Sequence, residues 1–495
     1  MAGNDASRAS RLHPMLQSAY LRFQSQLVHP EPQRQRRAIL ALLLLCGLGV
    51  GLVVALGGPF VAIALFLAAL GGWLVVRSPL WGLIGIVAIS TVLPFATLPF
   101  KIGFTPTFLD IAIFATFVVW AWRYVTGEET RLESSAIGVV VALFLAIAVV
   151  TFVIGIQNSQ PSMNNLRQFM EMVVSVTLFF VVINIVRDRR TLTLLAQALM
   201  IGGAAAGFFG VAFYLLPQAI TVSVLDGLSR LGYPGGYAAL RFVNDDPAGL
   251  MRAIGTSIDP NVLGGLTILV GLFTLPQLFT PRPILPRRWV ALILALDVAC
   301  LYLTISRGSM LGFALGACVI GALRYRKLLV IALVAGILLF LLPFTQTYIQ
   351  HLLEGFAGQD QATQMRFGEY RDALTLISRY PYFGVGFTGT PEIGLYIGVS
   401  SLYLLIAEEM GLIGLVIFLV VMALFLLLLL QNERRTSDPL FAPILTGILG
   451  SMIGLLAAGL LDHYLFNLTY PHMTALLWVF VGLGMATVRL SREQV

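Results

Sequence analysis

The chain has 495 residues, of which 58% are hydrophobic and only 11% are Asp, Glu, Lys or Arg. A soluble domain carries roughly 25% charged residues, so these proportions exclude a soluble enzyme, a disordered tail and a disulfide scaffold. The net charge of +7 is modest, and no basic stretch is interleaved with aromatic residues, so nucleic acid is not expected as a partner. The composition predicts an all-α, polytopic integral membrane helical bundle.

The N-terminal segment differs from the rest of the chain. Residues 1–38 are polar, with three arginines directly before the first apolar run. No small-residue cleavage site follows, so this segment does not have the pattern of a cleaved signal peptide. We interpret residues 1–38 as a cytoplasmic basic arm and residues 39–495 as a single transmembrane domain.

The remaining chain contains apolar runs of the length that crosses a bilayer, which predicts about 12–14 transmembrane helices. The runs at 309–323 and 328–343 are short for full spans. The others lie near 39–57, 59–76, 80–100, 106–122, 136–156, 170–186, 192–216, 261–280, 289–305, 401–430, 441–461 and 472–489.

The distribution of basic residues predicts the orientation. Most of the 31 Lys and Arg residues fall on the side that holds the N-terminus, as expected for the cytoplasmic side of an inner membrane. Both termini are therefore predicted to be cytoplasmic. Two periplasmic loops, 217–260 and 344–400, are much longer than the other outer connections, and the second precedes the last three predicted helices. Long loops of this kind are usually functional or disordered.

Arginines on the outer side are the main candidate site residues, because the positive-inside bias disfavours them there. Their planar, permanently charged groups suit bidentate binding of phosphate. The alternative for each arginine is an ion pair with a neighbouring acid. As a set they favour an anionic substrate. They are Arg230, Arg241, Arg252, Arg307, Arg366, Arg371 and Arg379.

The segment RAIGTSIDPNVLGG at 252–265 has the strongest local signal. Asp259 followed by Pro260 is typical of a helix start, with Asp as the N-cap and Pro at the first helical position. The positive end of this helix dipole would face the outer loop, where an anion could bind beside Arg252. The alternative is that Asp259 and Asn261 only cap a membrane helix.

Ionisable residues near membrane depth are further candidates. Arg307 lies in the turn TISRGSMLG at 304–312, where it either serves the site or extends to the interface. Glu408 and Glu409 fall about two turns inside an apolar helix. A carboxylate is costly there unless it is paired, so an arginine partner is expected.

Motifs for metal or nucleotide binding are missing from the sequence. It contains no His-Glu-x-x-His motif and no Cys/His cluster, so no metal site is predicted. It also lacks a P-loop and a Gly-x-Gly-x-x-Gly segment. No cofactor is therefore expected.

Four segments together resemble one family of enzymes. They are R-x-x-G-x-x-x-x-P-N at 252–261, T-x-S-R-G at 304–308, the stretch from Arg366 through P-x-F-G-V-G ending at residue 386, and YLLIAEEMGLIGL at 403–415. In order and spacing, over about residues 165–490, they are similar to the O-antigen ligase and O-antigen polymerase superfamily of GT-C-like integral membrane glycosyltransferases.

The resemblance implies metal-independent transfer of a glycan from undecaprenyl diphosphate at the periplasmic face. On the matching positions, Arg252 and Arg366 would hold the diphosphate and stabilise it as the leaving group. Arg307, Arg241, Arg371 and Asn261 would complete the substrate-binding set. The implied partners are the lipid-linked glycan, membrane lipid and a chain-length regulator protein.

One position departs from the family pattern. In the ligases the helix after the large loop typically begins with His-Asn, and that His is the proposed catalytic group. Ser400 and Ser401 stand here instead, and a serine hydroxyl is a poor general base. Either His351, Glu409 or Asp259 accepts the proton, or arginine electrostatics dominate catalysis.

The departure favours a polymerase of O-antigen or exopolysaccharide repeat units, because polymerases of the superfamily often lack this His. The alternative is a ligase of lipopolysaccharide biosynthesis that transfers glycan to lipid A-core or another acceptor. A solute transporter is the alternative from a different class. It would favour paired ionisable groups at mid-membrane, yet the predicted spans contain few charges, notably Asp110, Glu171 and Asp297.

Overall fold

The structure is a computed structural model of the chain, and it describes residues 32–98, 101, 103–341, 361–389 and 398–493. The chain divides into two compact units, residues 1–73 and residues 74–495. In the first unit the described residues belong to helix α2 (Pro32–Arg77), which continues into the second unit. This single helix covers both apolar runs that the sequence predicts at 39–57 and 59–76. The predicted arm lies mostly outside the described residues.

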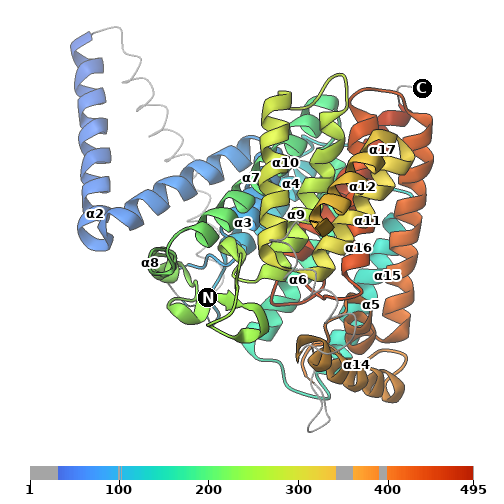
Figure 1. Cartoon of the computed structure of the whole chain (residues 1–495). Helices are drawn as coiled ribbons and strands as arrows, with labels where there is room; N and C mark the ends of the chain where they lie inside the picture. The colour runs from blue at the N-terminus through green and yellow to red at the C-terminus, as the bar shows by residue number, and fades with distance from the viewer. Residues whose placement is uncertain (1–31, 99–100, 102, 342–360, 390–397, 494–495) are drawn as a thin grey trace. The chain divides into compact units, whose positions relative to one another are not determined.

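The second unit is a helical bundle (Figure 1). Eight helices among the described residues are long and apolar enough to cross a membrane, which confirms the predicted polytopic helical fold. Its long helices are α3 (Pro79–Val92), α4 (Phe108–Val125), α5 (Gly138–Gly155), α6 (Met163–Ile185), α7 (Arg189–Leu215), α9 (Pro260–Thr274), α10 (Arg287–Thr304), α11 (Arg307–Leu323), α12 (Arg326–Leu341), α15 (Leu402–Arg435), α16 (Phe441–Ala458) and α17 (Pro471–Arg492).

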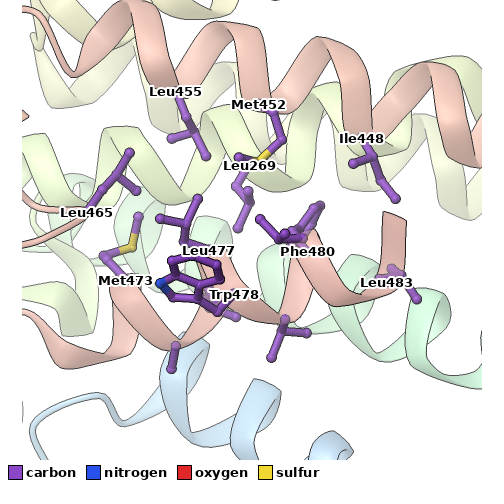
Figure 2. Packing of buried hydrophobic residues seen from close by; sticks show 14 of the residues in the cluster. Leu269, Ile448, Met452, Leu455, Leu465, Met473, Leu477, Trp478, Phe480 and Leu483 are labelled. Carbon is purple, nitrogen blue, oxygen red and sulfur yellow. The ribbon is translucent and has the colours of Figure 1, made fainter. Parts of the chain in front are cut away.

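Helices α9, α16 and α17 form the centre of this bundle. Between 83% and 94% of their most apolar segments is buried inside the protein, whereas α4 and α5 expose most of theirs. A helix that is apolar on all sides is expected to lie inside a large bundle. Figure 2 shows Trp478 and Phe480 of α17 beside Leu269 of α9 and Met452 of α16. This core supports the helix ends that carry the candidate site.

Small residues bring α11 and α16 into close contact. Gly312 and Gly316 of α11 face Gly450 and Gly454 of α16, so each helix contributes a Gly-x-x-x-Gly pair. A methyl group added to Gly312 would lie 2.4 Å from the carbonyl oxygen of Gly454. Small residues at such spacing let helix backbones approach closely inside a membrane.

Helix α15 is interrupted at Gly411, which has φ 69° and ψ −179°. The break frees backbone carbonyls that would otherwise accept bonds within the helix. The amides of Val385 and Gly386 donate to the carbonyls of Glu408 and Glu409, at 2.7 and 3.1 Å. The turn that follows α14 therefore packs against α15 through backbone hydrogen bonds, and only glycine tolerates the positive φ at position 411.

The two long loops predicted from the sequence contain ordered elements. The first holds α8 (Gln218–Leu228) and an antiparallel hairpin of β1 (Arg241–Phe242) and β2 (Met251–Arg252). The second holds α14 (Gln361–Arg379). In Figure 1 these elements lie at the end of the bundle opposite to the C-terminus. Short 3₁₀ turns complete the fold: η1 (Ser229–Leu231), η2 (Tyr237–Ala239), η3 (Val243–Asp245), η4 (Gly255–Ser257) and η5 (Leu275–Leu278).

Replacing Gly312 by Ala tests the α11–α16 contact. The added methyl group would meet backbone, which moves only if the helices separate. We expect a loss of roughly 1–3 kcal/mol in the free energy of unfolding, as overpacking costs, seen as a lower Tm of the purified protein in detergent. Gly85→Ala is the matched control, since its methyl group would have no atom within 4 Å. An equal Tm for the two variants would contradict this packing.

Candidate functional site

The start of α9 is built as the sequence predicts. Asp259 is the N-cap, and one carboxylate oxygen accepts from the amides of Asn261 and Val262 at 2.8 and 3.0 Å. Pro260 occupies the first helical position, where a missing N–H has no cost. The positive end of the α9 dipole therefore lies beside the hairpin strand that ends in Arg252.

Arg252 joins two helix ends. Its Nε donates to the carbonyl of Thr304, the last residue of α10, at 2.8 Å, and Nη2 donates to Oδ1 of Asn261 at 2.7 Å. The backbone then turns through Ile305, at φ 54°, and α11 begins at Arg307. The structure thus brings the side chains of Arg252 and Asn261, which belong to one sequence motif, into contact, and it places Arg307 at the next helix start.

Arg241 lies directly opposite Arg252 in the hairpin register. Residues paired in this way project from the same face, and like charges directly opposite each other are destabilising. Arg241 is exposed, and its Nη1 donates to the carbonyl of Ala238 at 2.9 Å. A bound anion between the two guanidinium groups would offset their repulsion.

Helix α14 presents Arg366, Glu369 and Tyr370 towards the bundle and leaves Arg371 exposed. Glu369 Oε2 accepts from the amide of Ser400 at 2.9 Å. The Tyr370 hydroxyl donates to the carbonyls of Ser400 and Leu460, at 3.2 and 3.4 Å. These contacts fix α14 against the start of α15 and the segment that follows α16.

The segment between α16 and α17 contributes Asp462 and His463, which sequence reasoning did not select as site residues. The carbonyl of Asp462 accepts from the amide of Leu402 at 2.9 Å, which ties this segment to the start of α15. Asp462 Oδ1 accepts from the His463 amide at 2.8 Å and lies 3.9 Å from His463 Nδ1. An Asp-His pair directly after an apolar run on the outer side was the available sequence signal.

Charges from three segments act on Asp462, namely its own segment, the start of α9 and helix α14. Burial raises the pKa of its carboxyl, and the negative charge of Asp259 adds to this rise, whereas His463 and Arg366 oppose it. Burial also raises the pKa of Tyr470, as do Asp259 and Asp462, while Arg241 acts in the opposite direction. The hairpin, the α9 start, α14 and the α16–α17 segment therefore share one electrostatic environment.

The sequence predicts an arginine partner for Glu408 and Glu409. Among the described residues this prediction is wrong. Both side chains are buried in α15. Oε2 of Glu409 has no hydrogen-bond partner among the described residues, and no arginine is among the charges that act on either carboxyl group. The amides of Val385 and Gly386 bond to the carbonyls of these two glutamates, so backbone and not an arginine side chain contacts α15 at this point.

Other selected residues are accounted for as follows. His351 lies outside the described residues. Arg167, an outer-side arginine outside the selected set, bridges Asp110 and Glu171 at 3.1 and 2.8 Å. In the described ranges, no three His, Cys, Asp or Glu side chains are grouped as metal ligands.

Residues 290–419 match the family model described as O-antigen ligase. This match confirms the resemblance to the O-antigen ligase and polymerase superfamily. It supports glycosyltransferase activity of the ligase or polymerase type in a multi-pass membrane protein. The matched segment runs from α10 to the middle of α15 and contains Arg307 and Arg366, whereas Arg252 and Asp462 lie outside it. The comparison with curated proteins found no match.

Glu369→Ala tests how α14 is attached. Losing the acceptor leaves the Ser400 amide unsatisfied, which costs about 1–3 kcal/mol locally. We expect faster hydrogen exchange at residues 398–402, measured by mass spectrometry on the purified protein. Arg371→Ala, on the exposed face of the same helix, should leave this exchange unchanged. Unchanged protection in Glu369→Ala would contradict the proposed attachment.

Proposed function

We propose that the chain transfers a glycan from undecaprenyl diphosphate to an acceptor hydroxyl at the periplasmic face of the bacterial inner membrane. Both termini would then be cytoplasmic, with the hairpin, α14 and the α16–α17 segment on the periplasmic side. The family match supports this class of reaction. The distribution of basic residues along the sequence supports the orientation.

The arrangement around Arg252 carries the proposal. Its guanidinium is oriented by Thr304 and Asn261 at the α9 N-terminus, and Arg241 is its partner in the hairpin register. Fixed positive charge at this place can stabilise a diphosphate as the bond from the sugar C1 to the phosphate oxygen breaks. Arg366, with Arg307 and Arg371, would complete the charge around the leaving group.

The acceptor proton needs a base, and the two serines at the start of α15 do not supply one. The Ser400 amide is bonded to Glu369, and Ser401 is only 5% exposed. Asp259 is engaged as a helix cap and Glu409 is buried, whereas the His463 side chain is 21% exposed. We assign His463 as the base that takes the proton of the acceptor hydroxyl as the acceptor oxygen bonds to C1. Asp462 would stabilise the positive charge that forms on His463.

The polymerase remains our first assignment and the ligase the second, because the family's His is replaced by a serine whose backbone has a structural role. A transporter is less well supported, because paired ionisable groups at mid-membrane would favour transport. The ion pairs of Arg167 with Asp110 and Glu171 lie near the starts of α4 and α6. Asp297, within α10, has no hydrogen-bond partner among the described residues.

Arg252→Ala and Arg366→Ala test the diphosphate assignment. We expect kcat to fall at least 100-fold, since removing one preorganised stabilising donor typically costs about 10²–10³. The assay follows release of undecaprenyl diphosphate by the purified enzyme with a lipid-linked oligosaccharide. Lys101→Ala, an exposed cation outside the site, should retain activity. Full activity in both arginine variants would exclude this role.

His463→Ala tests the base. We expect kcat to fall about 10²–10⁴-fold, the usual contribution of general base catalysis, in the same release assay. Asp462→Asn should lower kcat by a smaller factor, because the neutral amide no longer stabilises the charge that forms on the imidazole during transfer. An unchanged kcat in His463→Ala would assign the proton elsewhere.

Analysis of surface glycans from cells with and without the gene separates the two enzyme types. Loss of chain length with a retained single-repeat product identifies a polymerase. Loss of attachment with accumulated lipid-linked polymer identifies a ligase. Surface glycans that do not change would contradict both assignments.

A further inference from the structure

A cavity of about 280 Å³ lies at the opposite end of the bundle from the candidate site. Arg489 at the cavity lies seventeen positions after His472 in α17, roughly 25 Å along the helix. The apolar part of the lining comes from α6, α15 and α17, and the polar part comes from the segment before α5 and the end of α17. The lining residues are Ser134, Ser135, Ala136, Ile183, Leu428, Met485, Val488, Arg489, Arg492 and Glu493.

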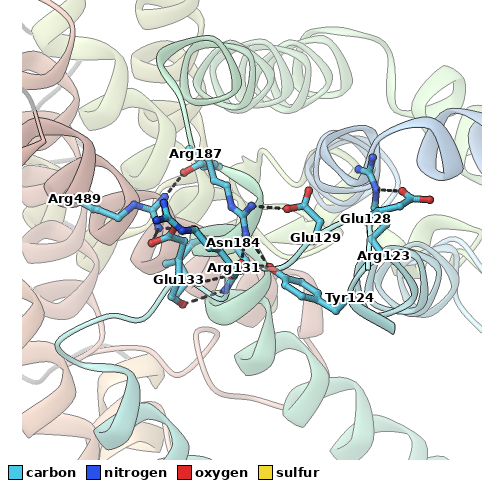
Figure 3. A network of polar contacts seen from close by, with 11 residues as sticks. Arg123, Tyr124, Glu128, Glu129, Arg131, Glu133, Asn184, Arg187 and Arg489 are labelled. Carbon is cyan, nitrogen blue, oxygen red and sulfur yellow. Dashed lines mark hydrogen bonds and ion pairs between the residues drawn. The ribbon is translucent and has the colours of Figure 1, made fainter. Parts of the chain in front are cut away.

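Arg489 forms one wall and is fully engaged by the protein. Its Nη atoms donate to the carbonyls of Ile183 and Val186, at 3.0 and 2.8 Å, at the end of α6. It also pairs with Glu133 at 3.2 Å, and Figure 3 shows this contact within a wider polar network. Arg489 therefore shapes the cavity and holds its segments together.

Arg492 differs from Arg489 in how its charge is used. Its Nε donates to Oδ1 of the buried Asn432 at 2.9 Å, which orients the guanidinium at the rim. No ion pair or other hydrogen bond of Arg492 is found among the described residues, and the residue is exposed. An oriented guanidinium with two open donor groups suits a phosphate oxygen pair.

The surroundings indicate that the ligand carries an apolar part. Ile183, Leu428, Met485 and Val488 supply an apolar floor beneath the polar rim. Close in sequence to the lining, Leu132, Val139 and Leu427 are 68%, 81% and 52% exposed, as expected of side chains that face lipid. The volume is near the lower limit of ligand pockets, about 300 Å³, which suits a headgroup better than a whole lipid.

We propose that this cavity binds the phosphodiester headgroup of a membrane glycerophospholipid, with the phosphate on Arg492 and the glycerol region over the apolar floor. The site lies about one bilayer thickness from the candidate active site, so it belongs to the other leaflet. Glu493 at the rim is 60% exposed and lies 3.9 Å from Arg489 Nε, and its remaining carboxylate positions could receive a headgroup ammonium. The proposal is independent of the transfer reaction.

Native mass spectrometry of the full chain in detergent tests the site. Phosphatidylglycerol, phosphatidylethanolamine and glycerol 3-phosphate are titrated separately. We expect the wild type to bind one phospholipid that Arg492→Gln binds at least tenfold more weakly. Ala136→Trp, which fills the cavity from an exposed position and keeps both arginines, should show the same loss. Arg435→Gln, an exposed arginine at the same end outside the lining, is the control.

The outcomes separate the lipid from its soluble headgroup. Binding of either phospholipid that both cavity variants weaken supports the site, and preference for phosphatidylethanolamine assigns Glu493 to the ammonium. Glycerol 3-phosphate binding as tightly as the phospholipids would overturn the lipid assignment. Equal lipid binding by the wild type and both cavity variants would overturn the site itself. Glycan transfer should stay intact in Arg492→Gln, so failure here is distinct from failure of the proposed function.

Discussion

The contact of one guanidinium with two helix ends organises the candidate site. Arg252 binds the last carbonyl of α10 and the side chain of Asn261 in the first turn of α9. A permanently charged, planar donor can satisfy both acceptors at once, which a lysine cannot do. This contact places a formal positive charge where the α9 dipole is also positive. It also fixes the hairpin, so Arg241 faces the same region from the opposite strand.

The second half of the site, formed by α14 and the start of α15, depends on the break in α15. The break at Gly411 lets residues 385–386 bond to α15, and this anchors the segment that follows α14. Glu369 and Tyr370 bind the backbone around Ser400 and Leu460. Arg366, on the same helix, is thereby held near Asp462. The geometry of this half of the site is held by hydrogen bonds to backbone groups more than by contacts between side chains.

The sequence was informative where local chemistry decides structure. Apolar runs predicted the helices, and Asp259–Pro260 predicted the start of α9, because capping is a property of neighbouring residues. The partner of Arg252 and the positions of Asp462 and Glu408 depend on contacts between distant segments. The break in α15 could not be predicted either, because Gly411 lies in a continuous apolar run and has no sequence signal that distinguishes it from other helical glycines. The sequence therefore predicts an arginine partner for Glu408. In the structure the backbone of Val385 contacts α15 at this residue.

Equilibrium binding of undecaprenyl diphosphate to the purified protein tests the central claim most directly. The account predicts that Arg252→Lys binds this lipid at least tenfold more weakly than the wild type, although the charge is kept, because a lysine cannot bridge Thr304 and Asn261. The fold is checked by an unchanged circular dichroism spectrum. Equal affinity of the two proteins for undecaprenyl diphosphate would contradict the claim that this oriented guanidinium holds the diphosphate.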